Sequence, residues 1–338
     1  MAGSRSSLTR SVVPALLATG VGLAALPASL AIAQSSPTSW PTRPVHLVVP
    51  FVPGGATDVI GRLVVDQLAA RLGQPVVIEN KPGAGGNIGA TVVAKSVPDG
   101  YTMFVAGSPG FPNAAALSKE PGFDPIRDFV PVALLGTQPM VLATHPSLAP
   151  NTVQELVAYA KANPAKLSYG TPGIGTPHHV SMELFKQTAG ISLEHIPFRG
   201  GAPMAQAVLA GEVPVMFGSY VVSGPHLKTG KLKALGVSSK RRLTQDTAIL
   251  PMAEQGYPDF DVEVWFGIVA PTGTPASIVE RMTRDTQAVL DMEEVRQRLL
   301  AVGYDPPPKL TSVEMGAWIK RDVVRWSEVF RKAGIAPE

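Results

Sequence analysis

The sequence predicts an α/β protein whose two lobes enclose a cleft. Short apolar strands alternate with helical patterns in two separate stretches, residues 45–106 and 152–238, an order typical of parallel sheets covered by helices on both faces. A longer β-rich run follows each stretch, at 129–144 and at 262–270. The chain has 338 residues, 45% hydrophobic and 16% charged, which is enough for two lobes. We therefore expect the long runs to carry the chain from one lobe to the other and back.

These two crossings divide the chain unevenly. We expect lobe 1 to be discontinuous, made of residues 40–140 and 250–338, and lobe 2 to hold residues 141–249. Two lobes with two connections form a clamp that can close on a ligand by a hinge motion.

The N-terminus has the pattern of a secretory signal peptide. Arg5 and Arg10 precede an uncharged apolar stretch over 12–33, which ends in the small-x-small cleavage signal AIA. We expect residues 1–33 to be the signal peptide and residues 34–39 a flexible leader. The alternative is an uncleaved membrane anchor, because the stretch is just long enough to span a bilayer. Pro14, Gly20 and Pro27 within it disfavour that alternative.

Composition excludes several function classes. Cleavage would remove two arginines and no acids, so the formal net charge falls from +3 to 3 − 2 = +1. No basic run interleaved with aromatic residues indicates a nucleic-acid partner. The absence of cysteine excludes disulfides, thiol nucleophiles and cysteine-based metal sites.

The first α/β unit is read from apolar spacing. The helix after the first strand has Ile60, Leu63, Val64, Leu68 and Leu72 on one face and ends at Gly73. Its predicted elements are a strand at 45–51, a helix at 59–72, a strand at 75–80, a helix at 88–96 and a strand at 101–106.

The second unit opens with a capping box, Thr152 to Glu155, and its next helix starts at Pro177 and ends before Gly190. Another capping box, Thr311 to Glu314, opens the last helix. Strands are predicted at 167–169, 193–198, 213–217 and 232–238, and helices of the tail at 276–290 and 295–302.

Two glycine-rich loops lie between a strand and a helix. PGGATD follows the first strand, and YGTPGIGTPHH follows the strand at 167–169. The first loop also has a structural interpretation, since Thr57 or Asp58 is a suitable helix cap. Each loop suits an anion, because a helix start carries unpaired N–H groups and positive partial charge. Ligands of open α/β sheets bind at these strand ends, so the pair favours an anionic ligand.

A set of motifs in this order resembles the substrate-binding proteins of tripartite tricarboxylate transporters, the Bug family. The resemblance runs from Trp40 to the C-terminus. It implies a periplasmic Venus-flytrap receptor of the type II-like periplasmic-binding-protein fold, without cofactor or metal. The implied ligand is a small di- or tricarboxylate or aromatic acid, and the implied partner is a membrane permease. Some members are ligand sensors, so a membrane sensor kinase is the alternative partner. We expect a monomer. The motifs are PFVPGGATDVIGR, VVIENKPGAGGNIGA, PDGYTMFVAG, SYGTPGIGTPHH, HIPFRGGAPMAQAVLAGEVPVMF, GKLKALGVSSKRR and WFGIVAPTGTP.

The resemblance also implies a set of ligand-binding residues, whose backbone amides and ordered waters hold a carboxylate in the family. Arg199 is expected near the same cleft, and Ser108 is expected to line it or cap a turn. The first loop supplies Phe51, Pro53, Gly54, Gly55, Thr57 and Asp58, and the second supplies Thr171, Gly175, Thr176 and His179.

One position departs from the family. Many members have a polar pair of the Asp-Asn kind after the strand at 213–217, where this chain has Gly218 and Ser219. The change removes an acidic contact and a bulky side chain. An amine-bearing ligand is therefore disfavoured, and a larger or aromatic acid has more room.

Other motifs suggest different functions less well. The glycines at 83–89 lack the spacing of a dinucleotide-binding motif. Ser108 lies in AGSPG, which has alanine in place of the first glycine of the nucleophile-elbow motif of serine hydrolases. An enzyme on this scaffold would need a nucleophile, base and orienting group that are not recognisable. Adjacent His178 and His179 point different ways on a helix and do not indicate a metal site. We expect one in the cleft, His179, and the other on the surface.

Two further groups have two readings each. Trp265 and Phe266 are either core residues of a hinge strand or a wall of the ligand site, and the basic run at 240–242 is either a solvated loop or a permease contact. Trp318, Trp326 and Phe330 are spaced as a buried helix face.

Overall fold

The computed structural model describes residues 40–338 except 109, 165, 333 and 336–338. The predicted signal peptide and leader lie outside the described residues. Within the described part, no helix is both long and apolar enough to cross a membrane.

The first part of the sheet is built as the periodicity predicts. Strands β1 (Val45–Val49), β2 (Val76–Asn80) and β3 (Thr102–Gly107) are parallel, in the order β2-β1-β3. Helix α1 (Ala56–Leu72) packs on β2, and α2 (Asn87–Ala94) packs on β3. The expected parallel sheet is present in these three strands, and β9 (Glu263–Pro271) extends it by joining β3 antiparallel.

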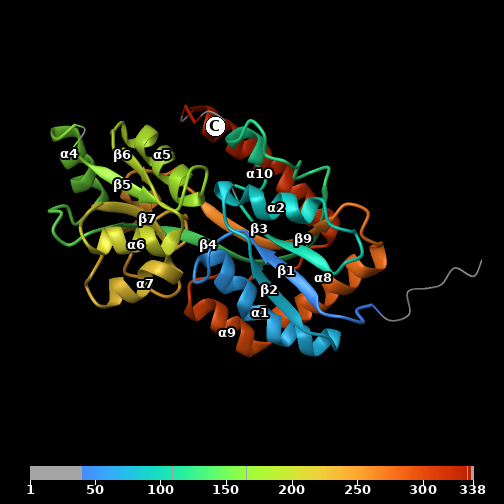
Figure 1. Cartoon of the computed structure of the whole chain (residues 1–338). Helices are drawn as coiled ribbons and strands as arrows, with labels where there is room; N and C mark the ends of the chain where they lie inside the picture. Colours follow the sequence, from blue (N-terminus) through green and yellow to red (C-terminus); the bar gives the residue numbers. More distant parts are fainter. Residues whose placement is uncertain (1–39, 109, 165, 333, 336–338) are drawn as a thin grey trace, which may run out of the picture. The chain divides into compact units, whose positions relative to one another are not determined.

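The two long β runs are the strands that join the parts of the sheet. Strand β4 (Phe129–Thr144) pairs with β9 over its first two thirds, and from Met140 onward with β7 (Val215–Ser219) and β8 (Lys233–Val237). In the described part of the chain these strands form one sheet of nine, in the order β2-β1-β3-β9-β4-β7-β5-β6 with β8 beside β4. Figure 1 shows β4 running from the strands β1, β3 and β9 toward β5 and β7.

The second part of the sheet repeats the strand–helix alternation. Strand β5 (Ser168–Thr171) lies parallel to both β6 (Glu194–Pro197) and β7. Its helices are α4 (Val153–Ala162), α5 (Pro177–Ala189), α6 (Gly201–Leu209) and α7 (Tyr220–Lys228). The tail holds α8 (Ala276–Leu290), α9 (Glu293–Ala301) and α10 (Ser312–Lys332), and the short elements are η1 (Ala84–Gly86), α3 (Ala114–Leu117) and η2 (Met252–Gln255).

Local signals set the helix ends. Gly73 and Gly190 take the left-handed conformation that ends α1 and α5. The last capping box is reciprocal, since Glu314 N–H donates to Thr311 Oγ1 and Thr311 N–H donates to Glu314 Oε2. The first differs slightly: Thr152 Oγ1 accepts from Glu155 N–H, but the Glu155 carboxylate reaches the N–H of Asn151.

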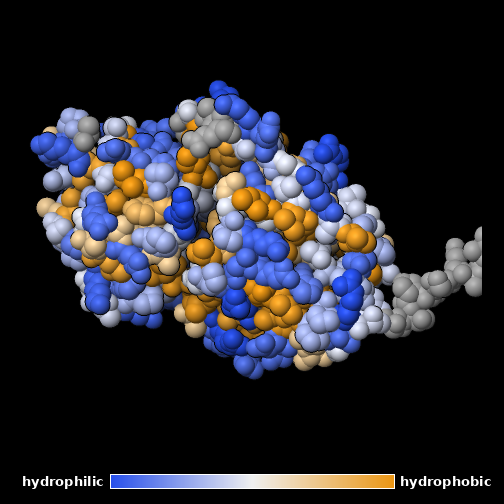
Figure 2. All heavy atoms as spheres, in the orientation of Figure 1, coloured by the Kyte–Doolittle hydropathy of each residue, from blue (hydrophilic) through white to orange (hydrophobic). Residues whose placement is uncertain are grey.

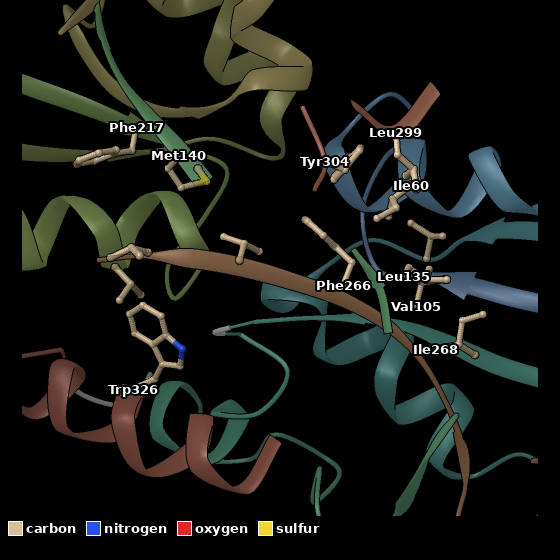
Figure 3. Close-up of a cluster of buried hydrophobic side chains, with 14 of the residues drawn as sticks. Ile60, Val105, Leu135, Met140, Phe217, Phe266, Ile268, Leu299, Tyr304 and Trp326 are labelled. Carbon is tan, nitrogen blue, oxygen red and sulfur yellow. The ribbon is translucent and has the colours of Figure 1, made fainter. Parts of the chain in front are cut away.

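The core follows the two-residue alternation of the strands. Leu47, Val49 and Val105 face α1, whereas Val48 and Phe104 face α2 and α10 in a separate cluster. Figure 3 shows Ile60, Leu299 and Tyr304 gathered beside Phe266 of β9. On the outer face drawn in Figure 2, apolar and polar residues are interspersed.

The predicted aromatic face of the last helix is confirmed in its second half. Trp326 and Phe330 are each 1% exposed, while Trp318 is only partly buried. The basic run at 240–242 is engaged in ion pairs: Arg241 contacts Glu263 and Asp305, and Arg242 contacts Glu254.

Candidate functional site

A cavity lies at the carboxyl ends of β1, β3, β5 and β7. It holds about 930 Å³ of space between atoms, part of it open solvent. The long strands β4 and β9 contribute one wall. Its lining residues include Phe51, Val52, Gly55, Ala56, Thr57, Gly85, Gly86, Asn87, Ser108, Gln138, Met140, Thr176, His178, Ser219, Val264 and Phe266.

Four helices have their N-cap residue on the lining of this cavity, and Gly201, the first residue of α6, lies on it as well. The four N-cap residues are Gly55 for α1, Gly86 for α2, Thr176 for α5 and Ser219 for α7, and none has a side-chain hydrogen bond capping the helix. All four line the cavity. The first N–H groups of a helix have no intrahelical partner and carry positive partial charge. Four uncapped helix starts around one cavity make an environment for an anion.

The rest of the lining is mainly apolar, with a few neutral polar side chains such as Asn87, Ser108 and Gln138. Rings of Phe51, Phe104, Phe111, Phe123 and Phe266 line the cavity, and no Asp, Glu, Lys or Arg does so among the described residues. An anion here would therefore be held by backbone dipoles and neutral side chains, and its organic body would contact aromatic rings.

The Asp58 carboxylate shapes the first loop from behind the cavity. It is 2% exposed, and its Oδ2 accepts from Gly54 N–H at 2.9 Å and from Arg62 Nε at 2.9 Å. Its Oδ1 accepts from Asn80 Nδ2 at 2.9 Å, and the same amide group donates to Phe51 O. Burial alone would raise the pKa of Asp58, but these bonds outweigh burial and lower that pKa below its ordinary value. With φ of +85° at Gly54, the clamp fixes a turn that glycine adopts readily.

A stack of rings supports the second loop. The ring centroid of His179 lies 4.2 Å from that of His195, which lies 5.0 Å from that of Tyr169, and the ring planes are nearly parallel. His179 Nδ1 accepts a hydrogen bond from the N–H of Gly175 at 3.1 Å, so this nitrogen carries no proton and the ring is neutral. Thr171 Oγ1 is 2.7 Å from His195 Nε2. Burial, and then the neighbouring His195, lower the pKa of His179 to about 4.

The structure places six of the predicted site residues on the cavity and eight elsewhere. On the cavity lie Phe51, Gly55, Thr57, Ser108, Thr176 and Ser219. Not on its lining are Pro53, Gly54, Asp58, Thr171, Gly175, His179, Arg199 and Trp265. Arg199 is exposed.

Neither histidine of α5 has the expected placement, because the cavity takes His178 rather than His179 and neither lies on the surface. His178 lines the cavity, and His179 is 6% exposed within the ring stack. One residue turns a helix by about 100°, so the choice between neighbours depends on a helix phase that spacing alone did not fix. The His178 Nδ1 atom is buried and has no hydrogen-bond partner among the described residues. Burial lowers the pKa of His178 to about 3.

Of the two predicted roles for this pair, Phe266 forms part of the cavity wall and Trp265 is a core residue. Because successive strand residues face opposite ways, Phe266 lines the cavity while Trp265 is buried beneath it. The indole Nε1 of Trp265 donates to Asp322 Oδ2 at 2.5 Å, and its backbone N–H donates to Ser108 Oγ at 3.2 Å. No histidine is hydrogen-bonded to Ser108 in the described part of the chain.

Sequence reasoning missed Gln138 and Met140 of β4 and the aromatic wall of Phe104, Phe111 and Phe123. A signal existed for Gln138, since it is a polar residue inside an apolar run. Over the described residues, no cluster of three or more His, Asp or Glu side chains could hold a metal ion.

Most of the chain matches a known family of proteins. The family model described as tripartite tricarboxylate transporter family receptor matches residues 60–335. Protein BugT of Bordetella pertussis is 35% identical over 316 residues, which cover 93% of this chain and 96% of BugT.

Solved structures give the same result. Rpa4515 of R. palustris, solved with adipate, superposes with a TM-score of 0.85 at 35% identity, covering 88% of this chain and 100% of that one. MatC of Rhodopseudomonas palustris, with bound malate, has a TM-score of 0.81 at 34% identity, covering 86% and 99%. The periplasmic binding protein BugD has a TM-score of 0.84 at 35% identity, covering 88% and 100%. The two-lobed periplasmic-binding-protein fold predicted from the sequence is therefore confirmed.

Proposed function

This chain belongs to the tripartite tricarboxylate transporter family of receptors, and we propose that it binds a small organic carboxylate in the cavity and delivers it to a membrane permease of that class. The receptor would work as a monomer in the periplasm, after export by the predicted signal peptide. The observation that carries the proposal is the convergence of four uncapped helix starts on a cavity whose described lining has no charged side chain.

The relatives support a carboxylate as the ligand. Rpa4515 was solved with adipate and MatC with malate, and both ligands are carboxylates. In this chain the matching charge would come from backbone N–H groups, which bind a carboxylate without the desolvation of a partner ion. No chemical step is required of any residue.

We further propose that binding closes two lobes, 40–140 with 250–338 against 141–249, about β4 and β9. The cavity takes residues from both lobes, such as Gly55 and Ser219, so a ligand that contacts both favours the closed state. Strand β4 changes partners from β9 to β7 at Met140, which is where a hinge between the two parts would lie.

A thermal-shift screen of residues 34–338 tests the proposal. The compounds are adipate, malate, citrate and aromatic carboxylates, each beside its neutral amide as a matched control. A ligand at about 100 times its Kd adds roughly 2.7 kcal/mol of stability, which raises Tm by roughly 5 °C for a protein of this size. Equal shifts for acid and amide, or no shift with any acid, would refute the anion site. Delivery is tested separately, by acid uptake into vesicles containing a permease with and without the receptor.

A further inference from the structure

Gln138 has an unsatisfied amide at the wall of the cavity. It belongs to β4, where it is paired with Val264 of β9, and its side chain is 1% exposed and lines the cavity. Neither its Oε1 nor its Nε2 has a hydrogen-bond partner in the part of the chain that the structure describes. Buried amides are nearly always hydrogen-bonded, and each exception requires an explanation. A ligand that supplies the missing partner is such an explanation.

The surroundings of Gln138 say what kind of group it would meet. Gly136 and Met140 lie on the same side of β4, and the facing side of β9 presents Val264 and Phe266. A second carboxylate at this wall would lose its hydration among apolar side chains with a single amide to replace it, which is unfavourable. A neutral polar group has a far smaller hydration to lose.

The chemistry of the amide narrows the choice further. Oε1 only accepts and Nε2 only donates, whereas a hydroxyl both donates and accepts. A hydroxyl on the ligand can therefore satisfy both atoms of Gln138. A carboxylate can only accept, so it would satisfy Nε2 and leave Oε1 facing a negative oxygen.

We propose that Gln138 selects the ligand by binding a neutral hydroxyl at the end opposite to its carboxylate, so that the preferred ligand is a hydroxylated, largely apolar monocarboxylate. This inference rests on the proposed function, since the carboxylate end is assigned to the helix starts. The wall of Phe104, Phe111 and Phe123 suits an aromatic body, and the shortage of charged groups on the described lining disfavours a dicarboxylate.

The test compares matched acids by isothermal titration calorimetry. The probes are benzoate, phenylacetate and 3-phenylpropanoate, each also with a 4-hydroxyl and with a 4-carboxylate, together with adipate and malate. The wild-type protein should bind at least one hydroxylated acid roughly tenfold or more tightly than its parent, because the parent leaves the amide unpaired. The matching dicarboxylate should bind more weakly than the hydroxylated acid.

Two variants separate recognition from structure. Gln138→Met keeps the length of the side chain and removes its polar atoms, so the preference for the hydroxyl should fall to within about twofold, while the parent acid binds at least as well as before. Thr137→Val is the control on the same strand, since Thr137 does not line the cavity, and it should keep the wild-type preference. Urea unfolding of both variants confirms that the fold is intact.

The outcomes distinguish this inference from the function on which it rests. An unchanged hydroxyl preference in Gln138→Met, or a wild-type preference for the dicarboxylates, would overturn the role of Gln138 and leave the receptor function standing. The same holds if adipate or malate binds and no aromatic acid does. If no acid binds at all, both the inference and the proposed function fail.

Discussion

The neutral ring of His179 should make the folded protein sensitive to mild acid, and His179→Gln should remove that sensitivity. In the folded state His179 accepts the N–H of Gly175 and stacks on His195. Glu183 and Lys186 on the same helix and Tyr169 on β5 are the other ionisable groups around it. Burial and the neighbouring His195 lower the pKa of His179 from 6.5 to about 4, and glutamine can still accept through its carbonyl oxygen.

The sign and size follow from proton linkage. Below the unfolded pKa of 6.5 the unfolded chain binds a proton at this position that the folded protein does not bind until about pH 4. Stability is therefore fully present above that unfolded pKa and is lost as the pH falls toward the folded pKa. Between about pH 7.5 and about pH 5 the loss amounts to ~2 kcal/mol, and the glutamine variant does not suffer it.

Urea unfolding at a series of pH values measures this difference. The free energy of unfolding of the wild type relative to His179→Gln should fall by ~2 kcal/mol across that interval. Thr188→Ser, a variant on the same helix without an ionisable group, should differ from the wild type by the same amount at every pH. The free energy of unfolding of the wild type relative to His178→Gln should fall by a similar amount over the same pH interval, because burial lowers the pKa of His178 to about 3. Parallel curves for the wild type and His179→Gln would refute the neutral buried ring.

Two further predictions concern the loops. Asp58→Ala should lower the free energy of unfolding by ~2–3 kcal/mol and weaken the binding of the acid. Asp58→Asn should also destabilise the protein, because all three hydrogen-bond partners of the Asp58 carboxylate are donors. An unaltered urea midpoint in both variants would show that these hydrogen bonds are unimportant. Gly175→Ala should weaken binding of the acid tenfold or more. The left-handed backbone at this position costs alanine roughly 1–2 kcal/mol, and the added Cβ would lie 2.3 Å from Leu117 Cδ1. Leu117→Ala should restore part of that loss in a double-mutant cycle, and strictly additive effects would argue against the contact.

The order of elements could be predicted from the sequence because it depends on local patterns. The spacing of Ile60, Val64 and Leu68 fixes the buried face of α1, and Gly73 fixes its end whatever packs on it. The run 129–144 was expected to cross between lobes, and β4 has those bounds. The antiparallel β9 was not expected, because strand direction depends on which distant segment closes the sheet edge.

The site was harder to predict, since neighbouring residues in one motif face opposite directions. The motifs contain both Asp58 and Thr57, and both His178 and His179, but only one member of each pair lines the cavity. Asp58 is prominent in sequence for a structural reason: it orders the loop that presents the helix start. A charged side chain attracts attention in a sequence, whereas the backbone N–H groups assigned here to the ligand leave no residue type behind.

The position of Gln138 on the cavity could not be predicted from local sequence either. In sequence it is one polar residue in an apolar strand, and nothing local says whether another segment satisfies its amide. Only the fold shows that β9 faces it with Val264 and that no described residue supplies a partner. Backbone groups of this kind can hold a carboxylate whatever the rest of the ligand is, so they do not discriminate between one acid and another. Under the proposed function, specificity then comes from the neutral side chains of the lining. The unsatisfied amide of Gln138 therefore constrains the proposed ligand more than the glycine loops do.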